Sequence, residues 1–303
     1  MEETRAPLPT RRARQIRPHR HERLTRRGDR CGFRTLKTLK CKFCQNEFEK
    51  LADAHIIPRS FFKLTRGKGK HSILVGVDEK ELDKKHKQAG LSDKSILCQD
   101  CDNHRFGPYD KHGIEAVLDL LNTKKLYRDD FGNPCAYLAN KANYAKFKLF
   151  LLSVLWRASI SSVEFYAHID LGNSHVERIK EMLKNQDPGT ETDYTFICFY
   201  QTGHHYPSTV LPSFQQRIEG VNFYRLYLPS NLIFLIKVDS RPLPDCFLNA
   251  AAKPNLPIPF LLCPYLGSPE MTYIENAKVL TKKHLGIPLR TRIFYKIEKP
   301  KSW

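Results

Sequence analysis

Cys41-Lys-Phe-Cys44 begins the stretch that decides the fold, which continues through Asp53-Ala-His55-Ile-Ile-Pro58 to Cys98-Gln-Asp-Cys101. Two Cys-x-x-Cys pairs supply the four thiolates that hold one tetrahedral zinc ion. Because four protein ligands leave zinc no open coordination position, we expect this metal to be structural. Any chemistry would then belong to His55 and to the polar residues that follow Cys101.

This stretch resembles the HNH, or ββα-metal, endonuclease family. The two cysteine pairs and the His-Ile-Ile-Pro segment occur in the family's order, and His55 lies eleven residues after Cys44, about the family's distance to its general base. Asp93 lies nine residues before Asp102, where the family has an asparagine relative to its second metal-site residue. The resemblance covers about seventy of the 303 residues.

The chain also departs from the family pattern. Ala54 stands where many members have a metal-binding aspartate or histidine, Asp93 stands at the asparagine position and Asp102 at that of the last histidine. Between His55 and Cys98 the chain runs 42 residues, so we interpret 63–94 as an insertion in the hairpin. A metal site without a ligand at Ala54 would have fewer protein ligands, and water and substrate phosphate would complete its shell.

The resemblance implies roles for the central residues. His55 would be the general base that takes a proton from the attacking water, with Asp93 or a backbone carbonyl orienting its imidazole. Asp102 would bind a catalytic Mg²⁺ or Mn²⁺. The alternative is a histidine packed in the hairpin and a helix-start aspartate.

The second protein ligand of the catalytic ion has three candidates, His104, Asn103 and Asp110, of which we select His104. Arg59 and Arg105 are predicted to grip phosphate near the scissile bond, because guanidinium groups bind phosphate oxygens in pairs. The alternative for both arginines is a solvated surface charge.

The net charge of +18 points to polyanionic partners. Half of it, +9, lies in residues 1–40, and the other half is spread over the rest of the chain. We therefore predict nucleic acid as the partner, DNA rather than RNA.

Nine cysteines, of which four have metal-site spacing, indicate a reducing cytoplasm rather than a disulfide framework. The longest apolar run, 149–156, is too short to cross a bilayer, and no apolar segment typical of a secretory signal follows the N-terminus. The sequence thus predicts a soluble, cytoplasmic protein without a membrane partner.

The predicted fold class is α+β: a basic tail over 1–38 that is disordered when free, a zinc-stapled ββα-metal (HNH-like) domain over 39–122, and a second α+β domain over 123–303 with an antiparallel sheet. The first domain is predicted to have strands over 51–57 and 72–77, a polar helix over 78–88, and a helix from Asp102 that breaks at Gly107-Pro108 and resumes through Leu121.

In the second domain we predict a turn-rich segment over 122–137, helices over 141–159 and 172–183, and strands over 194–200, 221–228 and 232–238, the last two joined as a hairpin. The proline-rich segment from Arg241 is expected to be irregular, with a short helix over 273–281. These features together predict a metal-dependent endonuclease that hydrolyses phosphodiester bonds in DNA. The alternatives are a non-catalytic zinc-knuckle protein that binds nucleic acid and an RNA endonuclease; the resemblance also implies a context such as phage defence.

Overall fold

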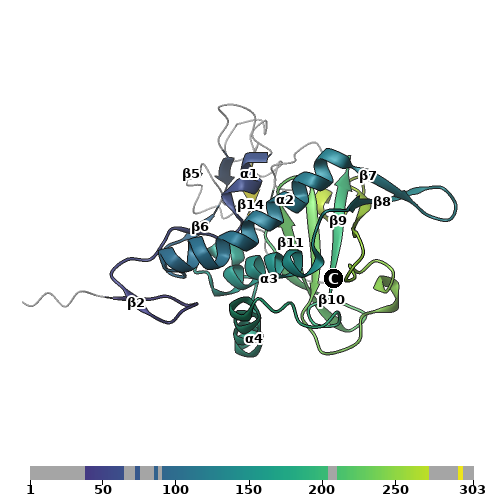
Figure 1. Cartoon of the computed structure of the whole chain (residues 1–303). Coiled ribbons are helices and arrows are strands. Elements are labelled where there is room, and N and C mark those ends of the chain that lie inside the picture. The colour runs from purple at the N-terminus through teal and green to yellow at the C-terminus, as the bar shows by residue number, and fades with distance from the viewer. Residues whose placement is uncertain are drawn as a thin grey trace, which may run out of the picture. The chain divides into compact units, whose positions relative to one another are not determined.

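The structure is a computed structural model that describes residues 38–64, 91–203 and 210–272, together with the backbone of 72–75, 85–87 and 293–295 (Figure 1). Its helices are α1 (Arg59–Leu64), the π-helix η1 (Cys101–Phe106), α2 (Gly107–Thr123), α3 (Tyr144–Ile160) and α4 (Gly172–Asn185), with 3-10 turns η2 (Glu164–Tyr166) and η3 (Asp245–Phe247). The predicted tail and the predicted helix over 273–281 lie outside the described residues, apart from Thr38.

The strands are short at the N-terminal side and longer towards the C-terminus. They are β1 (Leu39–Lys40), β2 (Glu47–Phe48), β3 (Ala54–His55), β4 (Ser72–Val75), β5 (Lys85–Lys87), β6 (Ser92–Asp93), β7 (Lys125–Arg128), β8 (Pro134–Ala139), β9 (Phe196–Thr202), β10 (Phe214–Ile218), β11 (Val221–Leu228), β12 (Leu232–Lys237), β13 (Ile258–Pro264) and β14 (Ile293–Tyr295).

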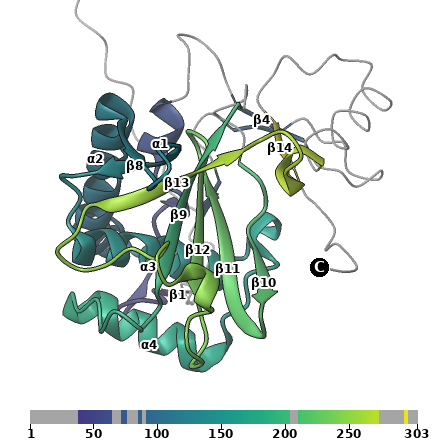
Figure 2. The ribbon, with the colours of Figure 1, turned by 90° about the vertical axis from the view of Figure 1, so that its right-hand side faces the viewer.

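Within the described residues, the largest sheet has seven strands in the order β10-β11-β12-β9-β13-β8-β7, most of which Figure 2 shows side by side. The predicted hairpin of β11 and β12 is confirmed: Leu228 pairs with Leu232, and in the three-residue turn between them Ser230 and Asn231 both have positive φ. The mixed α+β class is therefore confirmed. One pair of the sheet is parallel, however, because β13 runs alongside β9 in the same direction.

Helix α3 is buried almost all round, as its continuous apolar sequence predicts. Near its N-terminus, the Phe147 ring contacts three rings of the sheet, those of Phe196, Phe234 and Phe260, at centroid distances of 6.0, 6.0 and 6.2 Å. Near its C-terminus, Trp156 lies 5.6 Å from the ring of Phe106. This helix thus packs on the sheet at one end and on the cysteine-bearing segment at the other.

Helices α2 and α3 lie side by side (Figure 1). Their close approach depends on Gly113, where a Cβ atom would lie 2.5 Å from the ring of Phe150. A larger residue at 113 would force the two helices apart, because interiors are packed at crystal-like density.

The predicted start of a second helix at Gly107-Pro108 is confirmed, because α2 begins there, but the predicted break before it is wrong, since η1 continues directly into α2. The Gly107 amide donates to the Asp102 carbonyl, five residues back, which is the hydrogen bond of a π-helix. Pro108 then occupies the first turn of α2, where its missing N–H costs least. The π-helical turn therefore accommodates Gly107 and Pro108 without ending the helix.

Three predicted segments need correction. Of the predicted polar helix over 78–88, the described part is β5, which pairs with β4. The predicted turn-rich segment over 122–137 contains β7 and most of β8, a hairpin whose tip is held by the Asp129 carboxylate accepting from the Phe131 and Asn133 amides. The proline-rich segment after Arg241 contains β13, because tertiary pairing with β8 and β9 overrides its weak local preference.

The pair of β3 and β6 carries two of the predicted site residues. The strands run antiparallel, with Ala54 opposite Asp93 and His55 opposite Ser92. The segment between them contains α1 and the backbone of β4 and β5, as expected of an insertion in a hairpin. Among the described residues, no helix is long and apolar enough to cross a membrane.

Phe147→Ala tests the central packing. The substitution removes a ring that is 0% exposed and contacts four others, those of Phe150, Phe196, Phe234 and Phe260, so we expect it to lower the free energy of unfolding by about 3–5 kcal/mol. The matched control is Phe131→Ala at the β7–β8 turn, where the ring is 90% exposed and the expected cost is under about 0.5 kcal/mol. Urea denaturation measures both; equal costs would contradict the described core.

Candidate metal centre and the His55 site

Four cysteines meet in one cluster, as the sequence predicts. The sulfur atoms of Cys41, Cys44, Cys98 and Cys101 all lie within 4.8 Å of one another. Among the described residues, this is the one group of three or more Cys, His, Asp or Glu side chains whose ligand atoms come together in this way. The cluster is compatible with a structural metal site, because four convergent thiolates satisfy a tetrahedral ion.

Local backbone bonds position the cluster. The first pair lies in the knuckle between β1 and β2, where the Gln45 amide donates to the Cys41 carbonyl at 2.9 Å and Gln45 takes a positive φ of 68°. The second pair opens η1, and the Cys98 amide donates to the Cys41 sulfur at 3.3 Å. Burial raises the pKa of Cys98 and Cys101, so without a metal ion these groups would be neutral thiols.

His55 is half-buried at the end of β3. Burial lowers the pKa of its imidazole; the positive charges of Arg59 and Arg157 act in the same direction, and the Asp53 and Asp110 carboxylates oppose them. The pKa therefore stays below the ordinary value, and the imidazole is neutral at pH 7. A neutral imidazole is the form that can accept a proton.

A buried arginine joins this histidine to two helices. Arg157 of α3 is 0% exposed and donates through Nη1 to the His55 carbonyl at 2.8 Å. Its Nη1 and Nη2 also bind the two oxygens of Asp110 in α2, at 3.0 and 2.6 Å. The Phe106 ring packs against the guanidinium, with its centroid 5.3 Å from Cζ. The backbone of His55 is thereby tied to the helices behind it.

Asp102 lies in the same charged neighbourhood. Burial raises the pKa of its carboxyl; the Arg157 charge lowers it and the Asp53 charge raises it. Asp53, Asp110 and Arg157 also act on the His55 imidazole, so these charged groups and Asp102 share one electrostatic neighbourhood. Asp53 directly precedes β3 and is exposed.

Asp93 does not orient His55, contrary to the prediction. Directly opposed residues of a strand pair share a face and sequence neighbours alternate, so Asp93 shares the face of Ala54 rather than that of His55. Its carboxylate accepts hydrogen bonds from Ser95, Ser161 and Ser162. Burial opposes its ionisation, but these bonds outweigh that effect and lower its pKa to about 2. Asp93 anchors the end of α3 to β6.

The side chains of His104 and Asp102 do not lie on the same side of helix η1. The two residues are two positions apart on a helix, and such positions do not face each other. The His104 side chain is 76% exposed, with Nδ1 2.8 Å from the Asp100 carboxylate. Asp102 is thus left without His104 as a partner ligand.

The two predicted phosphate-binding arginines are both exposed. Arg59 begins α1, and its charge acts on the His55 imidazole. Arg105 lies in η1, where its charge acts on Tyr109 one turn further along the helix. These interactions associate Arg59 with the His55 site, whereas Arg105 acts on Tyr109.

Sequence reasoning missed Arg157 and Asp53. Arg157 had one available signal: it stands within a helix that is otherwise apolar near its C-terminal end. A charge buried in such a place requires a partner, and the partner is a second charged group elsewhere in the chain. That the partner of Arg157 is Asp110 depends on how α2 packs against α3.

Comparisons with protein-family models, with curated proteins and with solved structures each gave no match to this chain.

Arg157→Met tests the buried ion pair. The variant leaves the Asp110 carboxylate without its counter-charge, so we expect the free energy of unfolding to fall by about 3–5 kcal/mol. The double variant Arg157→Met/Asp110→Leu removes both charges and should recover part of that loss. Urea titrations of the three proteins measure this, and a single-variant cost below about 1 kcal/mol would contradict the role of the pair.

Cys98→Ser tests the metal centre. The purified wild-type chain should carry one metal ion that Cys98→Ser loses, with a fall in melting temperature. Cys246→Ser, at an exposed cysteine outside the cluster, is the matched control and should retain the ion. Metal analysis by mass spectrometry measures the content; equal metal content in both variants would exclude the cluster as the site.

Proposed function

We propose that this chain is a metal-dependent endonuclease that hydrolyses phosphodiester bonds in DNA, with His55 as the general base. The observation that carries the proposal is a half-buried neutral imidazole among the Asp53, Asp102 and Asp110 carboxylates, beside the exposed Arg59. The antiparallel pair of β3 and β6, followed by the helix of η1 and α2, agrees with the order of elements that the ββα-metal resemblance implies.

We propose zinc as the metal of the cysteine cluster. Zinc–sulfur bonds of about 2.3 Å in a tetrahedron place the sulfur atoms about 3.8 Å apart. The Cys44 and Cys98 sulfur atoms lie 3.9 Å apart, which is close to this spacing. An all-thiolate set also suits zinc better than the hard cations magnesium and calcium.

The chemistry follows from the neutral imidazole. His55 would take a proton from a water molecule, and that water would attack the phosphorus while the 3′ oxygen leaves. Asp102, with Asp53 nearby, would hold a Mg²⁺ or Mn²⁺ ion, which when bound stabilises the charge that develops on the phosphate. Arg59 would grip a phosphate oxygen at the same edge.

Few protein side chains are available as ligands for that ion, and magnesium tolerates a small number of protein ligands. Ala54 is 0% exposed and contributes no ligand atom, and Asp110 is occupied by Arg157. Magnesium is commonly held by one or two carboxylates together with water and substrate phosphates. The Asp102 and Asp53 carboxylates meet that requirement.

The nuclease proposal is tested with supercoiled plasmid and Mg²⁺. Wild type should nick the DNA, and His55→Ala should lower the rate about 100-fold or more, because general bases contribute at least this much. His104→Ala, an exposed histidine paired with Asp100, should cleave at close to the wild-type rate. Equal nicking by wild type and His55→Ala would refute the role of His55.

The pH profile provides a second test. Because the pKa of His55 is lowered from 6.5, the imidazole protonates, and the rate should fall, only as the pH drops below about 6.5. Cleavage at fixed Mg²⁺ should therefore be level from about pH 7 to 8 and decline on the acid side. A decline that begins above pH 7 would point to a base other than His55.

The alternative is a zinc-knuckle protein that binds nucleic acid without cleaving it. The loss of a ligand at Ala54 and the engagement of Asp110 by Arg157 are the features that favour it. It predicts DNA binding that weakens with salt and no cleavage in any divalent ion. An RNA endonuclease would use the same site, and a matched single-stranded RNA substrate distinguishes it from a DNA enzyme.

A further inference from the structure

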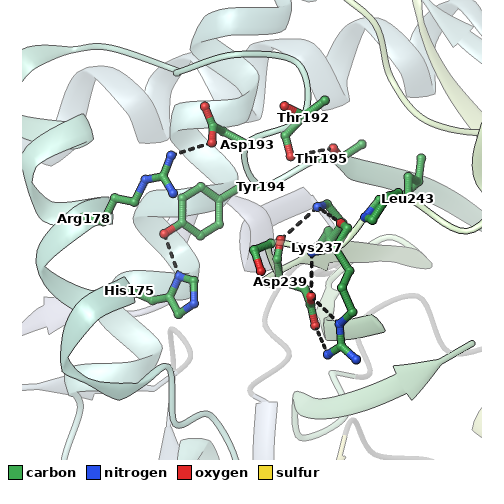
Figure 3. Close-up of a pocket in the computed structure, with 12 residues that line it drawn as sticks. His175, Arg178, Thr192, Asp193, Tyr194, Thr195, Lys237, Asp239 and Leu243 are labelled. Carbon is green, nitrogen blue, oxygen red and sulfur yellow. Dashed lines mark hydrogen bonds and ion pairs between the residues drawn. The ribbon is translucent and has the colours of Figure 1, made fainter. Parts of the chain in front are cut away.

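A cavity of about 560 Å³ lies between α4, the segment that precedes β9 and the loop that follows β12 (Figure 3). Its charged lining residues are Arg178, Asp193, Lys237, Asp239 and Arg241. None of its lining residues belongs to the cysteine cluster or to the His55 site. The volume is in the range of pockets that bind small molecules, about 300–1,000 Å³.

Lys237 is the unusual member of this lining. It is 4% exposed, and its ammonium donates to two backbone carbonyls, those of Asp239 at 2.9 Å and Arg241 at 2.7 Å. An ammonium has three donors, so these two hydrogen bonds leave one donor of Lys237 over. Within the described residues, both hydrogen-bond acceptors of this ammonium are neutral carbonyl oxygens. A buried charge in this position is stabilised by an anion.

Burial is the largest effect on the pKa of Lys237 and lowers it, whereas the two carboxylates of the lining, those of Asp239 and Asp193, raise it. The Asp193 carboxylate accepts from the Thr190 amide and hydroxyl and from the Arg178 guanidinium. The Asp239 carboxylate accepts from the Asn222 amide and from the backbone and guanidinium of Arg241. Arg178 is thus paired with Asp193 and Arg241 with Asp239, so three cations face two anions and the excess positive charge of the lining is that of Lys237.

One wall of the cavity is suited to an organic group. Figure 3 shows Tyr194 with Arg178 and His175 on one side, and Lys237, Asp239 and Leu243 on the other. The Tyr194 hydroxyl is 2.9 Å from His175 Nδ1, and Arg178 lies over the Tyr194 ring at 5.6 Å. The ring is thereby held in place. Pro242 and Leu243 add apolar surface.

We propose that this cavity binds a small organic phosphate of mononucleotide size. Its phosphate is recognised by the buried ammonium of Lys237. Arg178, which is paired with Asp193 through Nη2, offers its remaining guanidinium donors from the facing wall, and the Tyr194 ring and Leu243 cover the organic part. A phosphate fits better than a single carboxylate because cations reach the cavity from separate elements, and Thr192, Thr195 and Ser240 are among the lining residues. A cavity of this size is also larger than a free inorganic anion requires.

Isothermal titration calorimetry on the full-length, metal-loaded chain tests the proposal at physiological salt. The probes are AMP, CMP, GMP, UMP and ribose 5-phosphate, with adenosine and inorganic phosphate as comparisons. We expect at least one organic phosphate to bind about tenfold or more tightly than both comparisons.

Three variants assign the binding to this cavity. Lys237→Met should weaken it about tenfold or more, and Arg178→Gln, a side chain 57% exposed whose loss spares the fold, should weaken it severalfold, on the order of three- to tenfold. Lys184→Gln removes the same charge from the exposed face of α4, where Lys184 pairs with Glu181, and should leave the affinity unchanged. Because Lys237 also holds the loop after β12, Arg178→Gln carries the test if Lys237→Met unfolds.

Several outcomes would overturn the proposal. They are the absence of binding for all five organic phosphates, adenosine binding as tightly as AMP, and unchanged affinity in Arg178→Gln. The last result would place the binding on other cations of this basic chain. Since no lining residue belongs to the His55 site, failure here is independent of failure in the plasmid assay.

Discussion

The buried guanidinium of Arg157 is the constraint on which the arrangement of the site depends. A charge that is fully enclosed must be paired, because an isolated buried ion is too costly to persist. Arg157 meets this requirement with Asp110, 47 residues away, and with the carbonyl of His55, 102 residues away. One side chain of α3 thus determines where β3 and α2 meet, and the candidate general base lies at that meeting point.

The cysteine cluster stabilises the segment around β3 that the Arg157–Asp110 ion pair positions. Strands β1, β2, β3 and β6 have two residues each, which is too short for a sheet that stands by itself. A metal held by Cys41, Cys44, Cys98 and Cys101 would cross-link them across more than fifty residues, and metal binding in such small modules is folding free energy. The aromatic contact of Phe106 with Trp156 then joins this segment to the core on α3.

The two electrostatic environments in the chain differ in a way that bears on function. In the proposed function, the Asp102 and Asp53 carboxylates near His55 would hold a divalent cation. Around Lys237, the two carboxylates of the lining are paired with Arg178 and Arg241, and the remaining positive charge would bind the proposed phosphate. Since the two sites share no residue, the proposed nucleic-acid substrate and the proposed small phosphate would bind independently.

The sequence by itself determined the cysteine cluster, the buried helix α3 and the hairpin of β11 and β12, because spacing, apolar periodicity and turn residues are local signals. Only the tertiary structure decided the partners of the charged side chains. Asp93 sits at the spacing of a catalytic residue, yet strand register turns it towards Ser161 and Ser162 instead.

The same limit explains Arg157. Nothing in the residues around it names Asp110 or His55 as its partners, because their meeting results from how α2, α3 and β3 pack. Likewise β13 has little strand character of its own and gains its hydrogen bonds from β8 and β9. Contacts between residues far apart in the chain are set by burial of the whole core, and a reading of local pattern does not contain them.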